Sequence, residues 1–449
     1  MTTTALVYGM AISGHAVARA LHDRGVQVLV ADDVATDAKI AAAAELGSEL
    51  VERPDTATLD TLVANADIVC PAPGVAETHP VIAAATRHGK PIRTEIDLAY
   101  EWEQQRSGGP RPMLAVTGTD GKTTTTMMAA AMLRCAGLKV AAVGNTEVPL
   151  IAALDTDVDA FVVECSSFRL NWIDHFRSEA SVWLNFAADH QNWHVSMEAY
   201  ELAKARIWRH NRPSDIAVGY AADPVVMRNL VSAVGRRLSF GTDAADYRLV
   251  GTQLVGPGGP FAERASMTRG LPHDVSNALA AAAIAIESGL ASGGAVAEAL
   301  ATFEHPPHRI EQIGEFGGVR WFNDSKATTP HAAITAIRGF SQVVLLAGGR
   351  NKGLDLASMA GEHERVKAVV ALGESAPVIS DAFAPWCPVI EVASMAEAVV
   401  AAAGLATVGD TVLLSPGCAS FDWYPDGGYP ARGDDFKRLV HDYFEAGAA

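Results

Sequence analysis

The chain has 449 residues, of which 49% are hydrophobic and 7% aromatic, and its formal net charge is −17. This length predicts two to four domains, and the negative charge disfavours a nucleic-acid partner, because a phosphate backbone would be repelled. The five cysteines are scattered and lack metal-ligand spacing, so they favour a reducing compartment over a disulfide framework.

Two apolar stretches bear on targeting. Residues 1–12 lack the basic start of a secretory signal and lead directly into a glycine turn. The alanine-rich run 277–286 is interrupted by Glu287, Ser288 and Gly289, so it is too short to cross a bilayer and reads as a buried helix. We expect a cytoplasmic protein that does not insert into membranes.

The first α/β domain begins with a strand at residues 5–8, a turn from Gly9 to Gly14 and an amphipathic segment that ends near Arg24. A second strand, 27–31, closes on Asp32, and further strands are expected at 67–70 and 91–94. This is close to the dinucleotide-binding fingerprint, but Ala11 replaces its middle glycine. Three interpretations stay open: a nucleotide or sugar-nucleotide site, an NAD site, or a structural turn. Residues 107–112 read as a linker.

The next segment has the layout of a phosphate-binding loop. A buried strand, 113–116, runs into Gly118-Thr119-Asp120-Gly121-Lys122-Thr123, and residues 127–135 have helical composition. Glycines let backbone N–H groups converge on an anion, Lys122 can reach the outer phosphates, and the Thr123 hydroxyl can ligate Mg²⁺. The usual first glycine would fall at Val116. The loop indicates ATP or GTP, and the alternative is an ordinary glycine turn.

Polar side chains follow the next strands of this central domain. The strands are 139–143, 160–163 and 181–184. Glu164, at the end of the second, is either a metal ligand or a buried structural acid. His190, in the loop after the third, is either a metal or substrate contact or a surface histidine. Lys204 lies in the helical segment 197–209, and from the residues alone it is a solvated helix lysine.

The last domain opens at His308 and alternates strands with helices, which predicts a mostly parallel sheet. The strands are expected at 319–322, 342–346, 367–372, 389–392 and 411–414. The loops that follow three of them, 323–330, 348–353 and 415–422, gather Arg, Lys, Asp, Ser and Thr. Several such loops at strand ends suggest an anionic ligand, whereas a single one would be a solvated turn.

Taken together, the motifs resemble the Mur ligases of peptidoglycan assembly. The matching stretches are Gly-Thr-Asp-Gly-Lys-Thr-Thr at 118–124, Glu-Cys-Ser-Ser-Phe at 164–168, Asp-His at 189–190 with Lys204, His-Arg-Ile-Glu at 308–311 and Asn-Asp-Ser-Lys-Ala-Thr at 323–328. The shortened phosphate loop is the form that this family uses. The resemblance implies an α/β fold of three domains: a Rossmann-like domain at 1–108, a central P-loop ATPase-type domain at 109–306, and a C-terminal Rossmann-like domain at 307–449.

The resemblance also implies an activity. ATP, with Mg²⁺, would phosphorylate the alanine carboxylate of UDP-N-acetylmuramoyl-L-alanine, and the amine of D-glutamate would attack the acyl phosphate. The resemblance implies a monomeric protein that binds small-molecule substrates and no nucleic acid. Family positions correspond to Lys122, His190 and Lys204 as catalytic residues, and to Thr123, Glu164, His190 and Lys204, the last as a carbamate, as metal ligands. ATP contacts correspond to Gly118, Thr119, Asp120, Gly121, Lys122, Thr123, Thr124, Asn277, Arg309 and Asp324. Substrate contacts correspond to Ile12, Ser13, Asp32 and Asn145 for the precursor, and to Lys326, Thr328, Lys352, Ser420 and Phe421 for the amino acid.

Two departures from the family pattern and three rival functions accompany this interpretation. Asp274 stands where an asparagine usually contacts the adenine, and residues 423–430, beside the amino-acid pocket, differ from the common run. The rivals are the same chemistry with L-glutamate or another substrate, as in folylpolyglutamate synthases, a non-catalytic nucleotide-binding protein, and an NAD-dependent oxidoreductase. Only the turn Gly9 to Gly14 supports the last.

Overall fold

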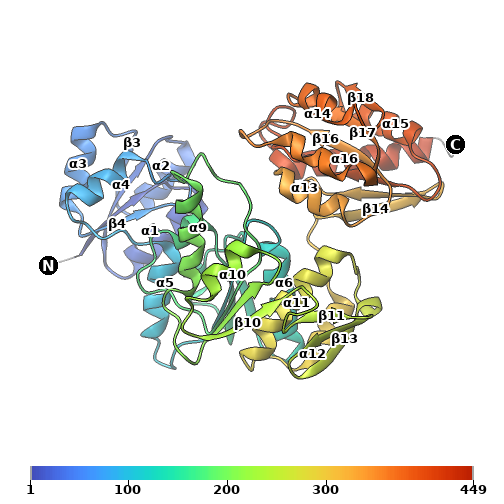
Figure 1. The fold of residues 1–449 in the computed structure, drawn as a ribbon. Coiled ribbons are helices and arrows are strands. Elements are labelled where there is room, and N and C mark those ends of the chain that lie inside the picture. The colour runs from blue at the N-terminus through green and yellow to red at the C-terminus, as the bar shows by residue number, and fades with distance from the viewer. Residues whose placement is uncertain (1–2, 447–449) are drawn as a thin grey trace. The chain divides into compact units, whose positions relative to one another are not determined.

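The computed structural model describes residues 3–446, so residues 1–2 and 447–449 of the predicted outer domains lie outside it. The described residues form two compact units (Figure 1). The first takes in the described residues up to Phe186, together with His190–Thr268 and Val275–Phe303. The second takes in Ala187–Asp189, Arg269–Asp274 and the described residues from Glu304 onward. The predicted first and central domains therefore share one unit.

The first unit begins with a parallel sheet in the strand order β3-β2-β1-β4. Its strands are β1 (Thr4–Tyr8), β2 (Gln27–Asp32), β3 (Leu50–Glu52) and β4 (Ile68–Pro71), and its helices are α1 (Ile12–Asp23), α2 (Asp37–Glu45), α3 (Thr56–Asn65), α4 (Pro80–Arg87) and α5 (Glu95–Gln104). The predicted strand 91–94 is wrong, because Ile92 makes only an isolated bridge to Val69. Pro91 has no N–H to donate to a ladder, and α5 begins at Glu95.

The turn after β1 shows why its glycines are needed. Gly9 has φ +94°, in the left-handed region that favours glycine. A Cβ on Gly14 would lie 1.7 Å from the carbonyl oxygen of Gly9. The strand and α1 therefore pack at backbone contact, and this much of the fingerprint is explained by structure alone.

The central sheet of the first unit is parallel throughout, in the order β10-β9-β8-β5-β7-β6. Its strands are β5 (Met113–Thr117), β6 (Val140–Gly144), β7 (Ala160–Glu164), β8 (Ala180–Trp183), β9 (Ile216–Tyr220) and β10 (Arg236–Phe240). The accompanying helices are α6 (Lys122–Cys135), α7 (Leu150–Ala153), α8 (Ser167–Leu170), α9 (Met197–Ala205), the 3₁₀ turn η1 (Arg206–Trp208) and α10 (Pro224–Leu230). The predicted strands are confirmed. The predicted helix at 127–135 begins earlier, at Lys122, and the segment 197–209 ends as a 3₁₀ turn.

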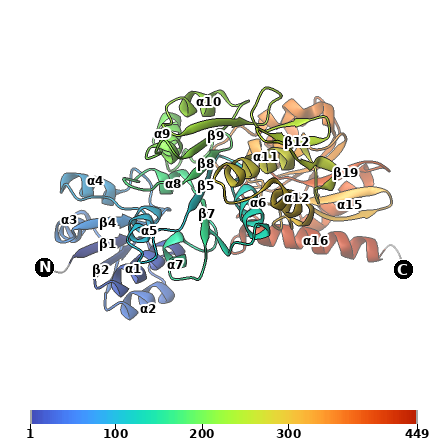
Figure 2. The same cartoon turned by 90° about the horizontal axis from the view of Figure 1, so that it is seen from below.

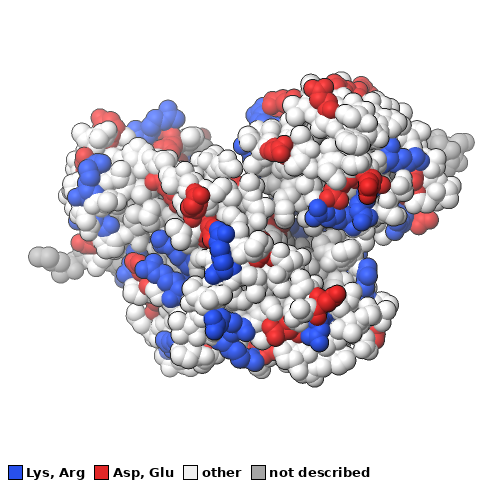
Figure 3. Space-filling view, in the orientation of Figure 1, with Lys and Arg blue, Asp and Glu red and all other residues white. Residues whose placement is uncertain are grey.

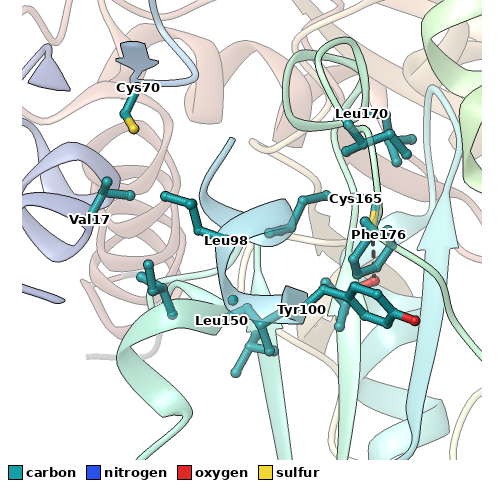
Figure 4. Close-up of a cluster of buried hydrophobic side chains, with 14 of the residues drawn as sticks. Val17, Cys70, Leu98, Tyr100, Leu150, Cys165, Leu170 and Phe176 are labelled. Carbon is teal, nitrogen blue, oxygen red and sulfur yellow. Dashed lines mark hydrogen bonds between the residues drawn. The ribbon is translucent and has the colours of Figure 1, made fainter. Parts of the chain in front are cut away.

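One hydrophobic core joins the two sheets of the first unit. In Figure 4, Val17 and Cys70 lie on one side of Leu98 from α5, with Cys165 and Phe176 on the other. Helices α1, α5 and α7 lie together in Figure 2 and contact one another. Each fully buried apolar side chain contributes roughly 1.5–3 kcal/mol relative to exposure, so this shared core fastens the two layers together.

A buried ion pair reinforces the same junction. Arg111, in the predicted linker, donates from Nε to Glu103 Oε1 at 2.8 Å and from Nη2 to Glu103 Oε2 at 2.7 Å. It also donates to the carbonyl oxygens of Leu154 and Thr156. Composition marked residues 107–112 as a linker, but the structure anchors this part of it.

The rest of the first unit includes a small antiparallel sheet that the sequence did not predict. It contains β11 (Arg248–Val250), β12 (Gln253–Gly256) and β13 (Gly259–Glu263), followed by the 3₁₀ turn η2 (Arg264–Ser266). Helix α11 (Pro272–Glu287), which buries its alanine run 278–283 completely, and α12 (Gly293–Thr302), which packs on α6, complete the layer. None of the described helices is both long and apolar enough to cross a membrane.

The second unit is built on a mostly parallel sheet, as predicted, in the order β14-β15-β19-β16-β17-β18. Only β14 (Glu311–Phe316) runs antiparallel, to β15 (Val319–Asn323); the others are β16 (Val343–Gly348), β17 (Val366–Leu372), β18 (Val389–Val392) and β19 (Thr411–Leu414). The helices are α13 (Pro330–Ile337), the 3₁₀ segment η3 (Leu356–Arg365), α14 (Ala376–Phe383), α15 (Met395–Leu405) and α16 (Gly428–Ala446).

Charges on the face drawn in Figure 3 are interspersed, with basic and acidic side chains side by side. No single-sign patch dominates the face drawn there, although the chain as a whole carries a net charge of −17. Screening at physiological salt limits each exposed charge to about 8 Å, so an anionic ligand depends on the cations in its immediate surroundings.

Candidate functional site

The glycine loop between β5 and α6 is shaped for close approach to a ligand. Gly121 has φ +81° and precedes the first turn of α6, where no side chain caps the helix. A Cβ on Gly121 would lie 2.7 Å from Asn277 Oδ1. The partial positive charge of the α6 N-terminus therefore faces a narrow glycine turn, which is the arrangement that binds phosphate. Thr123 is half-buried and Thr124 buried in this first turn.

Asn185, just after β8, holds the loop in shape. Its Oδ1 accepts the backbone N–H groups of Thr119 at 3.0 Å and Asp120 at 2.9 Å, and its Nδ2 donates to the Asp120 carbonyl at 3.1 Å. The Tyr200 hydroxyl lies 3.1 Å from Thr119 Oγ1. Sequence reasoning did not assign Asn185, and its position at a strand's carboxyl end was the available signal.

Two lysines converge on one carbonyl of the loop. Lys122 Nζ donates to the carbonyl oxygens of Gly118 at 2.8 Å and Thr119 at 2.7 Å. Lys204 Nζ donates to the same Gly118 oxygen at 2.5 Å and lies 4.8 Å from the centre of the Tyr200 ring. The expectation that Lys204 is solvated is wrong, because only 1% of it is exposed. Its face of α9 turns toward the loop, which helical periodicity alone did not reveal.

Glu164 ends the strand beside the loop. Strand β7 pairs with β5 so that Glu164 lies opposite Val116. The carboxylate is 1% exposed; Oε1 accepts from Asn145 Nδ2 at 2.9 Å, and Oε2 has no hydrogen-bond partner. An unsatisfied buried carboxylate oxygen is costly, so this atom fits a metal ligand better than a structural acid.

The other candidate metal ligands are a threonine hydroxyl, an imidazole and a lysine. Among the described residues, no group of three or more His, Cys, Asp or Glu side chains is arranged to hold a metal ion. Carboxylate oxygen and hydroxyl oxygen suit Mg²⁺, which usually keeps several waters and binds few protein ligands. Glu164 and Thr123 therefore fit Mg²⁺, and Lys204 fits only if it becomes an anion.

His190 lies in an aromatic cluster next to the loop. It has φ +55°, and its ring centre lies 4.6 Å from that of Phe168 and 5.9 Å from that of Tyr200. Tyr200 also contacts Thr119. The half-buried His190 is therefore held near the glycine loop, which the surface-loop alternative did not require.

Asn277 is brought to the same place by α11. Its Oδ1 accepts from Thr125 Oγ1 at 3.3 Å, and it is the atom that crowds Gly121. A residue more than a hundred positions from the loop in sequence thus lines it, and its role as an ATP contact stays a prediction.

The precursor candidates are in contrasting environments. Ile12 is 67% exposed, Ser13 is half-buried, and Asn145 is exposed. Asp32 is buried and already occupied, since it accepts from Met10 N at 2.6 Å and pairs with Lys39 at 2.8 Å. Burial disfavours its charged form, but these hydrogen bonds lower the pKa of Asp32 below its ordinary value.

In the second unit, the three polar loops predicted from the sequence meet one another. Ser415 Oγ donates to Asp324 Oδ2 at 2.7 Å, and Gly417 N donates to the Ala327 carbonyl at 2.9 Å. The loop after β16 joins them through reciprocal backbone hydrogen bonds between Arg350 and Ala419. Strands β15, β19 and β16 are neighbours, so their carboxyl ends form one edge.

The amino-acid candidates lie on these loops. Lys326 Nζ lies 3.8 Å from the centre of the Tyr429 ring, and Thr328 N donates to the Lys326 carbonyl at 2.9 Å. Ser420 is buried, whereas Phe421 and Lys352 are exposed. Tyr429 comes from the run 423–430 that departs from the family pattern, so that departure reaches the candidate pocket.

Asp274 is an ion-pair partner in the second unit. Arg269 donates from Nε and Nη2 to its two oxygens at 2.7 and 2.8 Å. Burial disfavours the charged form, but Arg269 and His273 hold the pKa of Asp274 well below its usual range. Arg269 Nη1 also donates to the Arg309 carbonyl at 3.0 Å, so Asp274 helps to fix the backbone of another ATP candidate.

Comparison with known proteins identifies matching domains along the chain. Three family models match: Mur ligase MurD-like, N-terminal domain, at residues 3–94; Mur ligase middle domain at 116–285; and Mur ligase, glutamate ligase domain, at 308–418. The chain is 40% identical to the UDP-N-acetylmuramoylalanine--D-glutamate ligase of Frankia casuarinae, over 97% of this chain and 93% of that protein. It is 35% identical to the ligase of the same name from Streptomyces coelicolor, over 97% of both.

Solved structures share the fold. The UDP-N-acetylmuramate-alanine ligase of Thermotoga maritima has a TM-score of 0.59 at 18% identity and covers 99% of this chain and 100% of its own. The folylpolyglutamate synthase of Mycobacterium tuberculosis has a TM-score of 0.57 at 18% identity, covering 72% of this chain and 92% of its own. The fold is therefore common to ligases with different substrates, and sequence carries the finer distinction.

The buried Asp324 generates a prediction about pH. Burial raises its pKa to about 7, against the hydrogen bond from Ser415. A group whose folded pKa is raised holds its proton more tightly when folded, so its contribution to stability is lost as pH rises from about 4 to about 7. The wild type should lose this contribution between pH 5 and pH 8, whereas Asp324→Asn has no such group to titrate. The unfolding free energy of the variant minus that of the wild type should therefore rise by on the order of 2–3 kcal/mol between these two pH values.

Hydrogen exchange of peptides covering β15 and β19 at the two pH values measures this difference in the second unit. Subtracting the wild-type change removes the contribution of every other titrating group. A difference between variant and wild type that is the same at both pH values would contradict the raised pKa.

Proposed function

The chain belongs to the Mur ligase family, and we propose that it is the ATP-dependent ligase that adds D-glutamate to UDP-N-acetylmuramoyl-L-alanine. The observation that carries this proposal is the identity of 35–40% over 97% of the chain to relatives that bear this name. A phosphate-binding loop with two lysines at one carbonyl supports the ATP-dependent part of it. The reaction belongs to the synthesis of peptidoglycan precursors, a part of cell-wall biogenesis in growing and dividing cells.

The chemistry follows from the weakness of a carboxylate as an acyl donor. A carboxylate oxygen of the precursor's alanine attacks the γ-phosphorus of ATP, and ADP leaves. The glutamate amine then attacks the acyl carbon, and phosphate leaves from the tetrahedral intermediate as the amide forms. Lys122 would stabilise the charge that develops on the transferring phosphoryl group.

Magnesium is proposed as the metal of this site. Thr123, Glu164, His190 and Lys204 as a carbamate would hold it, and when bound it would neutralise phosphate charge. The unpartnered Oε2 of Glu164 supports this assignment. Carbamylation of Lys204 would also remove a repulsion, because two ammonium groups now donate to the same Gly118 oxygen.

The remaining assignments extend the same proposal. The uridine-linked precursor would be bound by Ile12, Ser13, Asp32 and Asn145, with the buried Asp32 acting chiefly on the turn's backbone. Asn277, Arg309 and Asp324 would contact ATP. Lys326, Thr328, Lys352, Ser420 and Phe421 would bind glutamate, whose carboxylates suit lysine partners. Domains at 1–108, 109–306 and 307–449, a monomeric state and a cytoplasmic location, where ATP is supplied, complete the proposal.

L-glutamate is the second candidate substrate. It stays open because Tyr429, from the run that departs from the family pattern, lies against Lys326 and can change the contacts of the incoming amino acid. A folylpolyglutamate synthase-like substrate and a non-catalytic role are the further alternatives.

An amino-acid panel tests the proposal. With ATP, Mg²⁺ and UDP-N-acetylmuramoyl-L-alanine, ADP release should depend on D-glutamate and exceed that with L-glutamate by at least about 100-fold, the scale of one misplaced charged contact. Preference for L-glutamate would replace the substrate, and no ADP with any amino acid would leave a non-catalytic protein.

Lys122 should separate catalysis from precursor binding. Lys122→Ala is expected to lower kcat by at least about 100-fold. Precursor affinity measured by calorimetry should stay within about twofold of the wild type, because the uridine candidates belong to the sheet β3-β2-β1-β4 and its helix α1, and not to the glycine loop. Lys139→Ala, which removes an exposed lysine paired with Asp157, is the matched control. Equal loss of precursor affinity in Lys122→Ala would contradict the assignment.

Lys204 offers a chemical-rescue experiment. If it acts as a carbamate, Lys204→Ala should lose activity that acetate or formate partly restores, because a small carboxylate replaces the lost anion. The same acids should not restore Lys122→Ala, where a cation is missing. Failure of every small carboxylate to rescue Lys204→Ala, with circular dichroism unchanged, would count against the carbamate.

A further inference from the structure

Arg169 is a buried side chain at the centre of a polar cluster, and none of the assignments above gives it a role. It belongs to α8, which follows the strand that ends at the metal candidate Glu164, and only 4% of it is exposed. Its Nη2 donates to Ser13 Oγ at 2.6 Å, its Nη1 to Asn145 Oδ1 at 2.9 Å, and its Nε to Glu95 Oε2 at 3.2 Å. One guanidinium thus contacts two precursor candidates and one buried acid.

The contact with Asn145 determines which way that amide points. An arginine can only donate hydrogen bonds, and an ionised carboxylate can only accept them. The Asn145 oxygen must therefore face Arg169, which turns its NH₂ group toward Glu164 Oε1 at 2.9 Å. That hydrogen bond occupies one carboxylate oxygen and leaves Oε2 as the unpartnered one. Arg169 acts on the metal candidate through Asn145.

The cluster rests on a rigid base. Glu95 balances the charge of Arg169, and its other oxygen accepts the Ile151 N–H at 2.7 Å. Leu170, next to Arg169, and Leu98 from α5 belong to the core drawn in Figure 4. Because close-packed cores transmit displacements rather than absorb them, a shift at Ser13 reaches Asn145 through the guanidinium.

We propose that Arg169 is a positioning residue that couples the precursor-binding turn at Ser13 to the metal-binding carboxylate of Glu164 by way of Asn145. The inference rests on the proposed function, because it takes Ser13 and Asn145 as precursor contacts and Glu164 as a ligand of Mg²⁺. Binding of the precursor at Ser13 then stiffens the metal site at Glu164, and binding of the metal stiffens the turn at Ser13. The planar, forked guanidinium of arginine connects the two sites.

Arg169→Lys separates this role from a structural one. Lysine keeps the positive charge that Glu95 needs, but it is a single donor on a flexible stem and cannot hold Ser13 and Asn145 together. Partners that orient a metal ligand typically change metal affinity by about 10–100-fold. We expect Arg169→Lys to weaken Mn²⁺ binding in the presence of ADP by about tenfold and precursor binding by about fivefold.

Arg111 provides a matched control. It is also a buried arginine paired with a buried glutamate at the same junction, and it donates to two backbone carbonyls. Its partners named here are Glu103, Leu154 and Thr156, none of which is a site candidate. Arg111→Lys should lower thermal stability about as much as Arg169→Lys. It should leave both binding constants within about twofold of the wild type, because it shares none of these partners with the site candidates.

The measurements are direct binding constants of the full chain. Free Mn²⁺ is read by electron paramagnetic resonance with ADP present, and UDP-N-acetylmuramoyl-L-alanine binding is read by calorimetry. A double-mutant cycle with Asn145→Ala tests the route: in that background, Arg169→Lys should no longer change Mn²⁺ affinity. Wild-type-like binding in Arg169→Lys, or additive effects on Mn²⁺ affinity in the cycle, would overturn the inference.

Three further outcomes have different meanings. If Arg169→Lys does not fold, Glu95→Gln with Arg169→Gln removes both charges together and takes its place with the same expected losses. If the wild type fails to bind the precursor or to turn over, the proposed function fails. If the wild type is active and Arg169→Lys behaves like Arg111→Lys, only the positioning role fails.

Discussion

The pairing of β5 with β7 is the constraint on which the candidate site depends. Parallel neighbours end at the same edge of a sheet, so the register that sets Val116 opposite Glu164 also sets the glycine loop beside that carboxylate. The loop itself owes its shape to Gly121 and to Asn185, which accepts two of its backbone N–H groups. A shift of this register by one residue would turn Glu164 to the other face of the sheet. The carboxylate of Glu164 would then no longer lie beside the glycine loop. Lys122, directed at the Gly118 carbonyl, then supplies local positive charge in a chain that is acidic as a whole.

Much of this arrangement was predictable from the sequence, because it depends on local patterns. Short apolar runs located most strands of the parallel sheets, although β3, β9 and β10 were not predicted. Polar residues at the carboxyl ends of the predicted strands located the glycine loop, Glu164 and the three loops of the second unit. The strand predicted at 91–94 failed because Pro91 interrupts the ladder and leaves only the Ile92 bridge. The antiparallel sheet at 248–263 was missed, since its short strands are only partly buried and show no strong alternation.

Contacts between distant segments could not be predicted from the residues alone. Lys204 reads as a solvated helix lysine, and only the packing of α9 against the loop shows that it is buried. Arg169 meets Ser13 across more than 150 positions in sequence, and Tyr429 meets Lys326 across about 100. No periodicity encodes such pairs. The resemblance to the Mur ligases supplied Asn277 and Arg309, which local reasoning did not reach, but it gave no role to Asn185 or Arg169.

The central claim is that the precursor carboxylate is activated by phosphoryl transfer at the Lys122 loop, and trapping the activated acyl group tests it most directly. The wild type is incubated with ATP, Mg²⁺, UDP-N-acetylmuramoyl-L-alanine and hydroxylamine, with no amino acid present. We expect the wild type to form the hydroxamate of the precursor, ADP and phosphate, and Lys122→Ala to form none of the three. Release of AMP and pyrophosphate, or ADP without any hydroxamate, would contradict it.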